Sequence, residues 1–116
     1  MNLEQFYTGR DEDYLVILGR FMGNEKLLGK FVKNFPDDPT YKRLCSAMEA
    51  RDWEQAEMSA HTLKGVAANL SFTKLYQASA DLVFAIRGKE LDKGEELFQK
   101  VDKAYKEVVQ DISGLD

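Results

Sequence analysis

The residues of this chain whose types and spacing suit chemistry are His61, Lys64 and Gly65, and His61 is the only histidine. A neutral imidazole keeps one ring nitrogen free near pH 7, which makes it a nucleophile that can attack phosphorus. Lys64 lies three residues further on and Gly65 four, so in a helix both are surface neighbours of the ring. A phosphoryl group on that ring carries about two negative charges, which a nearby ammonium offsets. The three residues therefore indicate an imidazole that accepts a phosphoryl group.

Gly65 needs an explanation of its own, because glycine inside a helix costs about 1 kcal/mol relative to alanine. Its missing side chain either lets a partner's loop come close to His61 or permits close packing against a neighbouring helix. A solitary helical histidine is ordinarily a plain surface residue. The functional interpretation of His61 therefore depends on the two neighbours that stand beside it.

The segment from Trp53 to Leu70 is predicted to form one amphipathic helix that carries these residues. One side of that helix gathers the residues suited to burial: Ala56, Ser59, Ala60, Leu63, Val66, Ala67 and Leu70. The other side carries Glu54, Glu57, Met58, His61, Lys64, Gly65 and Ala68. The imidazole is therefore expected to point outward, toward solvent or a partner.

The run His61-Thr62-Leu63-Lys64-Gly65-Val66-Ala67-Ala68-Asn69-Leu70 resembles the signature of histidine-containing phosphotransfer (HPt) domains. In that signature, H-x-L-K-G is followed by small residues and Asn-Leu-Gly. The resemblance extends from about Leu27 to Val108. Other comparable features are Phe31 to Phe35, the Ala50-Arg51-Asp52 turn, Ala60, Leu75 to Leu82 and the Arg87-Gly88 turn.

The resemblance implies that His61 is the phospho-acceptor, that Lys64 stabilises the phosphoryl charge and that Gly65 provides clearance. The implied partners are the receiver domains of response regulators and, as a further candidate, a hybrid histidine kinase. No cofactor and no metal are expected on this chain, since the catalytic Mg²⁺ and its acidic pocket would belong to the receiver. The partner-docking residues are expected to be Glu57, Met58, Gly65, Ala68 and Phe72, although Phe72 also suits the core.

Two positions depart from the family pattern. The family usually has glycine where this chain has Ser71, and often glutamate where it has Val83. At the first position we expect Asn69 to take the left-handed conformation and Ser71 to cap the next helix. At the second we expect an effect on stability or surface charge.

The composition is that of an ordinary globular protein, with 44% hydrophobic and 31% charged residues in 116,. A single domain is expected, with a helical N-terminal cap over about residues 1–35 and a bundle over about residues 38–113. The net charge of −4, with lysines interleaved among acids, argues against a nucleic-acid surface,. Lys26, Lys30 and Lys33 are expected to form a solvated helix face.

No apolar run is long enough to span a bilayer, and Met1-Asn2-Leu3-Glu4 lacks the basic start of a secretory signal,. We therefore expect a cytoplasmic monomer with no membrane partner. The only cysteine, Cys45, excludes an internal disulfide and is expected to be a buried structural thiol,. One histidine and one cysteine do not make a metal cluster.

Apolar residues recur at helical spacing along the whole chain and never alternate as in a strand, so no sheet is predicted. The predicted fold is all-α, an antiparallel up-down four-helix bundle with additional short N-terminal helices. The bundle helices are expected near residues 38–50, 53–70, 74–87 and 91–113. The N-terminal helices are expected over Leu3 to Tyr7, from Tyr14 to before Gly23, and over Glu25 to Asn34.

Several residues predict where the bundle helices begin and end. Asp38 is expected to be an N-cap with Pro39 as the first helical residue. Asp52 with Gln55, and Asp92 with Glu95, have the spacing of capping boxes, although the last helix could begin a turn earlier. Gly88 is expected to end the third bundle helix.

The leading hypothesis is a phosphorelay intermediate, in which His61 takes a phosphoryl group from a receiver aspartate and passes it to another receiver. A first alternative is a helical docking module that binds a receiver or another signalling partner without accepting phosphate. A second is the phospho-accepting domain excised from a chemotaxis-type histidine kinase. The chain has no GxxxxGK[ST] run and no kinase glycine motif, so autonomous kinase activity is not expected,.

Overall fold

Helix is the only regular secondary structure in the computed structural model, which describes residues 1–116. The elements in chain order are α1 (Leu3–Thr8), α2 (Tyr14–Arg20), α3 (Glu25–Asn34), the 3₁₀ turn η1 (Phe35–Asp37), α4 (Thr40–Glu49), α5 (Trp53–Asn69), α6 (Thr73–Arg87) and α7 (Leu91–Ile112). The prediction of an all-α chain is confirmed, and the predicted bounds hold within two residues for most helices.

The chain forms two compact units. One consists of residues 1–37 together with 107–116, and the other of residues 38–106. Helix α7 contributes residues to both. The second unit carries the HPt-like signature, and we call it the bundle unit.

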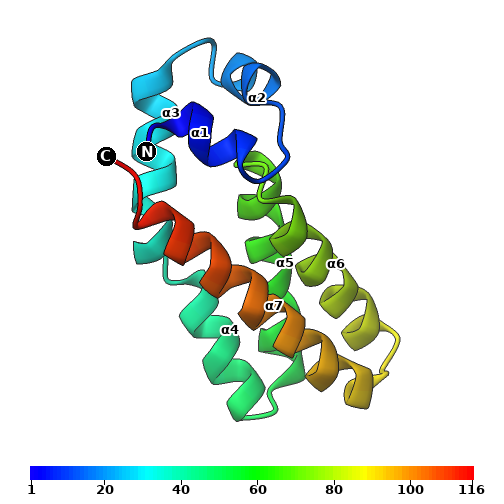
Figure 1. Ribbon diagram of the computed structural model, residues 1–116. Helices are drawn as coiled ribbons and strands as arrows, with labels where there is room; N and C mark the ends of the chain where they lie inside the picture. The colour runs from blue at the N-terminus through cyan, green and yellow to red at the C-terminus, as the bar shows by residue number, and fades with distance from the viewer. The chain divides into compact units, whose positions relative to one another are not determined.

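The bundle unit consists of α4, α5, α6 and the first sixteen or so residues of α7,. Figure 1 shows these four helices side by side, each running opposite to the one before it. The predicted antiparallel bundle is therefore confirmed. Buried apolar residues from all four helices form its interior: Leu44, Ala56, Ala60, Leu63, Ala67, Leu75, Leu82 and Val101.

The predicted helix starts are correct in part. Helix α4 begins at Thr40, one residue after the predicted start at Pro39, although the Asp38 carboxylate accepts from the Thr40 amide at 2.8 Å as an N-cap side chain does,. Helix α7 begins at Leu91, one residue before Asp92, so Asp92 lies inside the first turn. The Gly94 amide there donates to the Glu90 carbonyl at 3.0 Å. Asp52 caps α5 as expected, although only the half of the box that involves the Gln55 amide forms.

Helix α6 ends at Gly88 as predicted, but Gly88 has an ordinary right-handed backbone with φ of −80°. The left-handed residue is Lys89, with φ of 57°. Two bonds characteristic of a Schellman end follow, from the Lys89 amide to the Ile86 carbonyl and from the Glu90 amide to the Ala85 carbonyl,. The glycine therefore marks the helix end without supplying its special conformation.

The other unit contains α1, α2, α3, η1 and the end of α7. Its centre is aromatic, with Phe6 and Tyr7 almost fully buried and their rings edge to face at 5.0 Å. Burial raises the pKa of the Tyr7 phenol. The Arg10 guanidinium donates to the Asp111 carboxylate at 2.5 Å, which ties α7's last turns to the loop after α1.

The predicted apolar stripe of α3 is buried on one side only. Leu28, Val32 and Phe35 are buried, but Leu27 and Phe31 are exposed. The Phe31 ring lies 5.8 Å from Phe21 and covers it from outside. Helical spacing predicts that Leu27, Leu28, Phe31, Val32 and Phe35 form one stripe of the core, and this expectation is wrong for the two exposed residues at its edge,.

Candidate functional site

Helix α5 positions the candidate residues on a rigid support of 17 residues. Asp52 fixes its start by accepting from the Gln55 amide,. The predicted inner face is confirmed, since every residue of it is buried except Val66, which is half-buried. Packing along one side thus holds the helix, and this makes the opposite side face outward.

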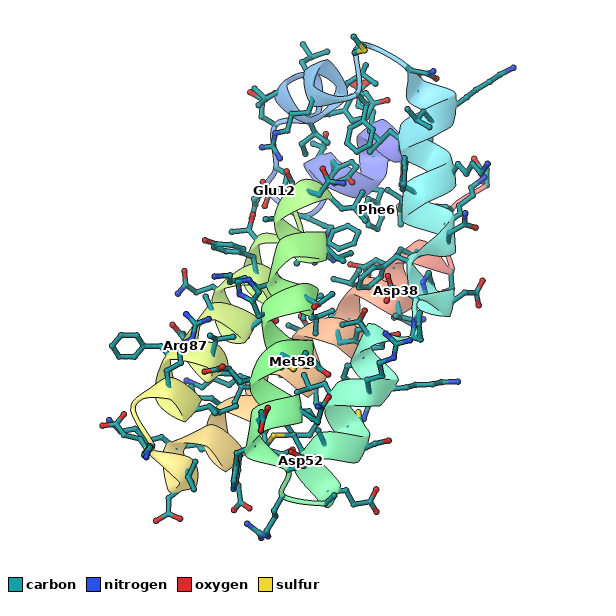
Figure 2. The ribbon with its side chains drawn as sticks, turned by 180° about the vertical axis from the view of Figure 1, so that it is seen from behind. Phe6, Glu12, Asp38, Asp52, Met58 and Arg87 are labelled. Atoms are coloured by element: carbon teal, nitrogen blue, oxygen red, sulfur yellow. The ribbon has the colours of Figure 1, made fainter.

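His61 lies in the middle of that opposite side and is exposed. Its imidazole makes no hydrogen bond and no ion pair with the rest of the chain. Both ring nitrogens are therefore free of protein partners, which is what nucleophilic attack by one of them requires. Figure 2 labels two residues of the surrounding helices, Met58, one turn before His61 on α5, and Arg87 on the adjoining α6.

Lys64 stands one turn beyond His61 and is half-buried. No carboxylate pairs with its ammonium, and the acid on the same side of α5, Glu57, pairs with another residue. Glu57 accepts from the Arg87 side chain at 3.1 Å, across the α5–α6 pair. The one cation close to His61 along its own helix is thus available to an incoming anion.

Gly65 faces open space. A Cβ placed on Gly65 would meet no atom within 4 Å. This excludes the interpretation in which the glycine permits close packing against a neighbouring helix. By contrast, a Cβ on Gly94 in α7 would lie 3.4 Å from the Trp53 ring. Of these two helical glycines, only Gly94 serves packing.

The remaining predicted docking residues divide into two groups. Met58 is 56% exposed, Ala68 is exposed, and Glu57 is half-buried beside Arg87. Phe72 has no exposed surface at all. Its assignment to the docking surface is therefore wrong, and the core interpretation holds, because the hairpin turns its ring inward.

The hairpin between α5 and α6 explains why Phe72 is buried. Ser71 takes the left-handed conformation with φ of 56°, and not Asn69 as expected. The Phe72 amide then bonds back to the Ala67 carbonyl at 2.8 Å and the Ser71 amide to Ala68 at 3.2 Å. This Schellman end favours glycine at the position of Ser71, which is the residue that the resemblance leads one to expect.

Two further expectations need correction. Val83 is 3% exposed, so of the two effects expected at this position burial agrees with the one on stability and contradicts the one on surface charge. Cys45 is half-buried where full burial was expected. Burial nonetheless raises the pKa of the Cys45 thiol, which keeps the sulfur in its less reactive form,.

Sequence reasoning missed the part that α6 plays beside His61. Arg87 was noted only within a turn, yet it holds Glu57. Phe84 and Tyr76 are exposed on α6 and entered no prediction. The signal was present, since Tyr76, Ala80 and Phe84 recur at a spacing of four, with Arg87 one turn beyond Phe84, on the side opposite the buried Leu75 and Leu82,.

The surroundings of His61 are open. A hollow of about 440 Å³ lies between α4 and the start of α5, and it is lined by Pro39, Lys42, Arg43, Ser46, Ala47, Ala50, Asp52, Gln55 and Ser59. His61 does not line it.

No three His, Cys, Asp or Glu side chains come together in a group that could hold a metal ion. None of the helices has both the length and the apolar character needed to cross a bilayer.

No curated protein and no solved structure matches the chain. The sequence model of the Hpt domain family matches residues 26–111, well over half of the chain, and this range includes all of α4, α5 and α6. The chain therefore belongs to the Hpt domain family, whose members carry phosphoryl groups in two-component signal transduction.

Proposed function

We propose that this protein is a phosphorelay intermediate that accepts a phosphoryl group on His61 from a receiver-domain aspartate and passes it to another receiver. The observation that carries the proposal is the exposed, unpartnered imidazole of His61, with the uncommitted Lys64 on one side and the open space over Gly65 on the other. Membership of the Hpt domain family supports the same function.

The transfer step involves one bond made and one broken. A lone pair on a ring nitrogen of His61 attacks the phosphorus of the aspartyl phosphate, and an N–P bond forms. The bond between phosphorus and the carboxyl oxygen breaks, and the aspartate leaves as a carboxylate with the electron pair. The proton on the second ring nitrogen stays on the ring or passes to solvent. Transfer to the next receiver reverses these events.

The neighbours of His61 have distinct roles in this proposal. Lys64 offsets the charge of the phosphoryl group as it arrives and while it resides on the ring. Arg87 neutralises Glu57, which would otherwise place a carboxylate four residues from the phosphorylated ring,. Gly65 and Ala68 leave the surface low enough for the receiver's loops. The receiver supplies Mg²⁺ and the acidic pocket that holds it.

We further propose that both compact units belong to one domain and that the protein acts as a cytoplasmic monomer. Helix α7 runs through both units, which favours joint unfolding. Far-UV circular dichroism and the fluorescence of Trp53 should therefore report one thermal transition at the same temperature. Two separate transitions, or a dimer mass by light scattering, would contradict this part of the proposal.

The transfer itself is tested with a phosphorylated receiver and intact-mass spectrometry. The wild-type protein should gain one phosphoryl group that is labile in acid and stable in alkali, as expected of a phosphorylated histidine. His61→Gln should gain none while its unfolding temperature stays unchanged. Glu49→Gln, an exposed substitution on α4, serves as the matched control and should behave as wild type.

Two results would overturn the proposal. The first is an adduct that survives in His61→Gln, which would place the acceptor elsewhere. The second is the absence of any adduct on the wild-type protein across a panel of receivers. If such receivers nevertheless bind with measurable affinity, the protein is a docking module and not a carrier.

A further inference from the structure

Exposed large apolar side chains of the bundle unit occur on two of its helices only. Met58 on α5 is 56% exposed, and Tyr76 and Phe84 on α6 are 37% and 77% exposed. Neither α4 nor α7 exposes a large apolar side chain. A helix that is covered by nothing ordinarily shows polar residues outward. The pair α5–α6 therefore differs from the rest of the bundle unit.

The Glu57–Arg87 ion pair fixes how α5 and α6 lie against each other. On α5, Met58 and Gly65 are on one side of His61, and Glu57 and Lys64 are on the other. Because Glu57 contacts Arg87, α6 borders the side that carries Lys64. This agrees with the half-burial of Lys64. Met58 thus lies on the side of His61 away from α6, and the side toward α6 carries the Glu57–Arg87 ion pair.

The same contact fixes the level of Phe84. His61 lies four residues beyond Glu57, about 6 Å along α5 at a rise of about 1.5 Å per residue. Phe84 lies three residues before Arg87, and because α6 is antiparallel this is about 4.5 Å in the same direction. His61 and Phe84 are therefore nearly level, on packed helices whose axes are about 8 to 10 Å apart.

That proximity determines what must cover Phe84. A stable protein interface buries about 800 Å² on each partner, which corresponds to a disc of about 16 Å radius. A receiver whose aspartyl phosphate reaches His61 centres its footprint near that ring. Phe84 falls well inside the disc, and aromatic side chains in such positions often provide much of the binding energy. A small phosphate donor would contact none of it.

We propose that Phe84 is an apolar anchor for the receiver domain and that α6 forms the second half of the docking surface. Arg87 lies at the edge of this anchor and Met58 on the far side of His61, so the imidazole stands between two apolar contacts. The inference rests on the proposed function, because it takes the receiver as the occupant. It adds a residue that determines how tightly the receiver binds.

The test compares Phe84→Ser with Leu15→Ser. Leu15 is 76% exposed on α2 in the other unit, so the control removes an equally exposed apolar side chain far along the sequence from His61. Each variant is assayed with a phosphorylated receiver and, separately, with phosphoramidate, a small donor that phosphorylates accessible imidazoles. In Phe84→Ser, the ratio of the receiver-driven to the phosphoramidate-driven rate should fall about tenfold, through a higher KM for the receiver. Leu15→Ser should keep the wild-type ratio.

Binding is measured as well, so that docking is examined apart from chemistry. In a His61→Gln background, which cannot be phosphorylated on that ring, Phe84→Ser should weaken receiver binding about tenfold by calorimetry. A ratio and an affinity within twofold of wild type would overturn the inference while leaving the proposed function intact. So would an equal loss in Leu15→Ser. If the wild-type protein accepts from phosphoramidate but neither binds nor accepts from any receiver, the proposed function fails, and this inference fails with it.

Discussion

The α5–α6 face and the α4–α7 face of the bundle unit treat their outward groups in opposite ways. On the α4–α7 face, the Tyr41 ring stacks on Tyr105 with centroids 3.7 Å apart and planes 6° from parallel. The Tyr41 hydroxyl donates to the Asp102 carboxylate, which also accepts from Lys106 at 2.9 Å. These four side chains are therefore satisfied by one another within the chain.

On the α5–α6 face, the imidazole of His61, the ammonium of Lys64 and the Phe84 ring all lack a partner. Both faces carry aromatic and charged residues, so composition alone does not separate them. The difference is whether the chain satisfies its own groups. A face that does so contributes to stability, whereas a face that does not is available to another molecule. The comparison predicts that substitutions on the α4–α7 face change stability and not phosphoryl transfer, and that substitutions on the α5–α6 face change transfer.

The largest effect is expected at two helical glycines, Gly65 in the open space on α5 and the buried Gly94 of α7, which faces Trp53 and Ile86. Gly65→Leu should lower receiver-driven phosphoryl transfer about a hundredfold, because a side chain in the open space holds the reacting groups apart,. The same change should raise stability by up to about 1 kcal/mol, since leucine favours helix over glycine. Gly94→Leu should do the reverse, losing about 1 to 3 kcal/mol against Trp53 with transfer per folded molecule unchanged,.

The two glycine predictions are tested by measuring phosphoryl-transfer kinetics and thermal unfolding of both variants. A Gly65→Leu protein that transfers at the wild-type rate would show that no partner approaches this position closely. A Gly94→Leu protein of wild-type stability would show that the contact with Trp53 is not tight.

The second prediction concerns the α4–α7 face. Tyr41→Ala should lower the free energy of unfolding by about 2 to 3 kcal/mol, because it removes a stacked, half-buried ring and its bond to Asp102,. Tyr41→Phe keeps the stack and should lose only about 1 kcal/mol. Chemical denaturation measures both. Phosphoryl transfer per folded molecule should stay at the wild-type rate in each, and a loss of transfer would mean that this face also meets the receiver.

Periodicity predicted most of this architecture, because burial along one side of a helix repeats in the sequence. The predicted inner face of α5 is thus correct except for one residue, Val66, which is half-buried where burial was expected. Helix starts were predicted less closely, since α4 begins at Thr40 and not at the expected Pro39. Such choices depend on a single hydrogen bond, which the sequence does not show.

The site could be predicted where its signal lies within one helix. His61, Lys64 and Gly65 are predicted as a candidate site from their spacing along α5. Arg87 lies beside Glu57 only because α6 packs there, and the place that we propose for Phe84 depends on the same packing. Phe72 was misplaced for the same reason, because extending α5 past its end puts the ring outside, whereas the left-handed Ser71 turns it inward. The spacing of residues along one helix does not reveal the contacts that one helix makes with another. It also does not reveal which turn residue adopts a positive φ.

The third prediction tests whether Lys64 contributes charge. Lys64→Ala should slow transfer about fivefold, the effect of one exposed charge interaction, with stability unchanged. Lys64→Arg retains the charge and should recover most of the rate. The difference between alanine and lysine should shrink at high salt, because exposed charges are screened. Transfer rates that do not differ at low salt would show the lysine to be incidental.

The smallest effect is expected at the end of α6. Lys89 adopts φ of 57°, which costs a residue with a side chain about 1 to 2 kcal/mol relative to glycine,. Lys89→Gly relieves that strain, but glycine also gains freedom in the unfolded chain, worth about 0.5 to 1 kcal/mol. The net result should be a stabilisation of about 0.5 kcal/mol by chemical denaturation. Lys89→Ala removes the same side chain and keeps the strain, so it should match wild type. A glycine variant no more stable than the alanine variant would mean that the Schellman end of α6 holds Lys89 without strain, and that glycine at Ser71's position in related chains has another cause.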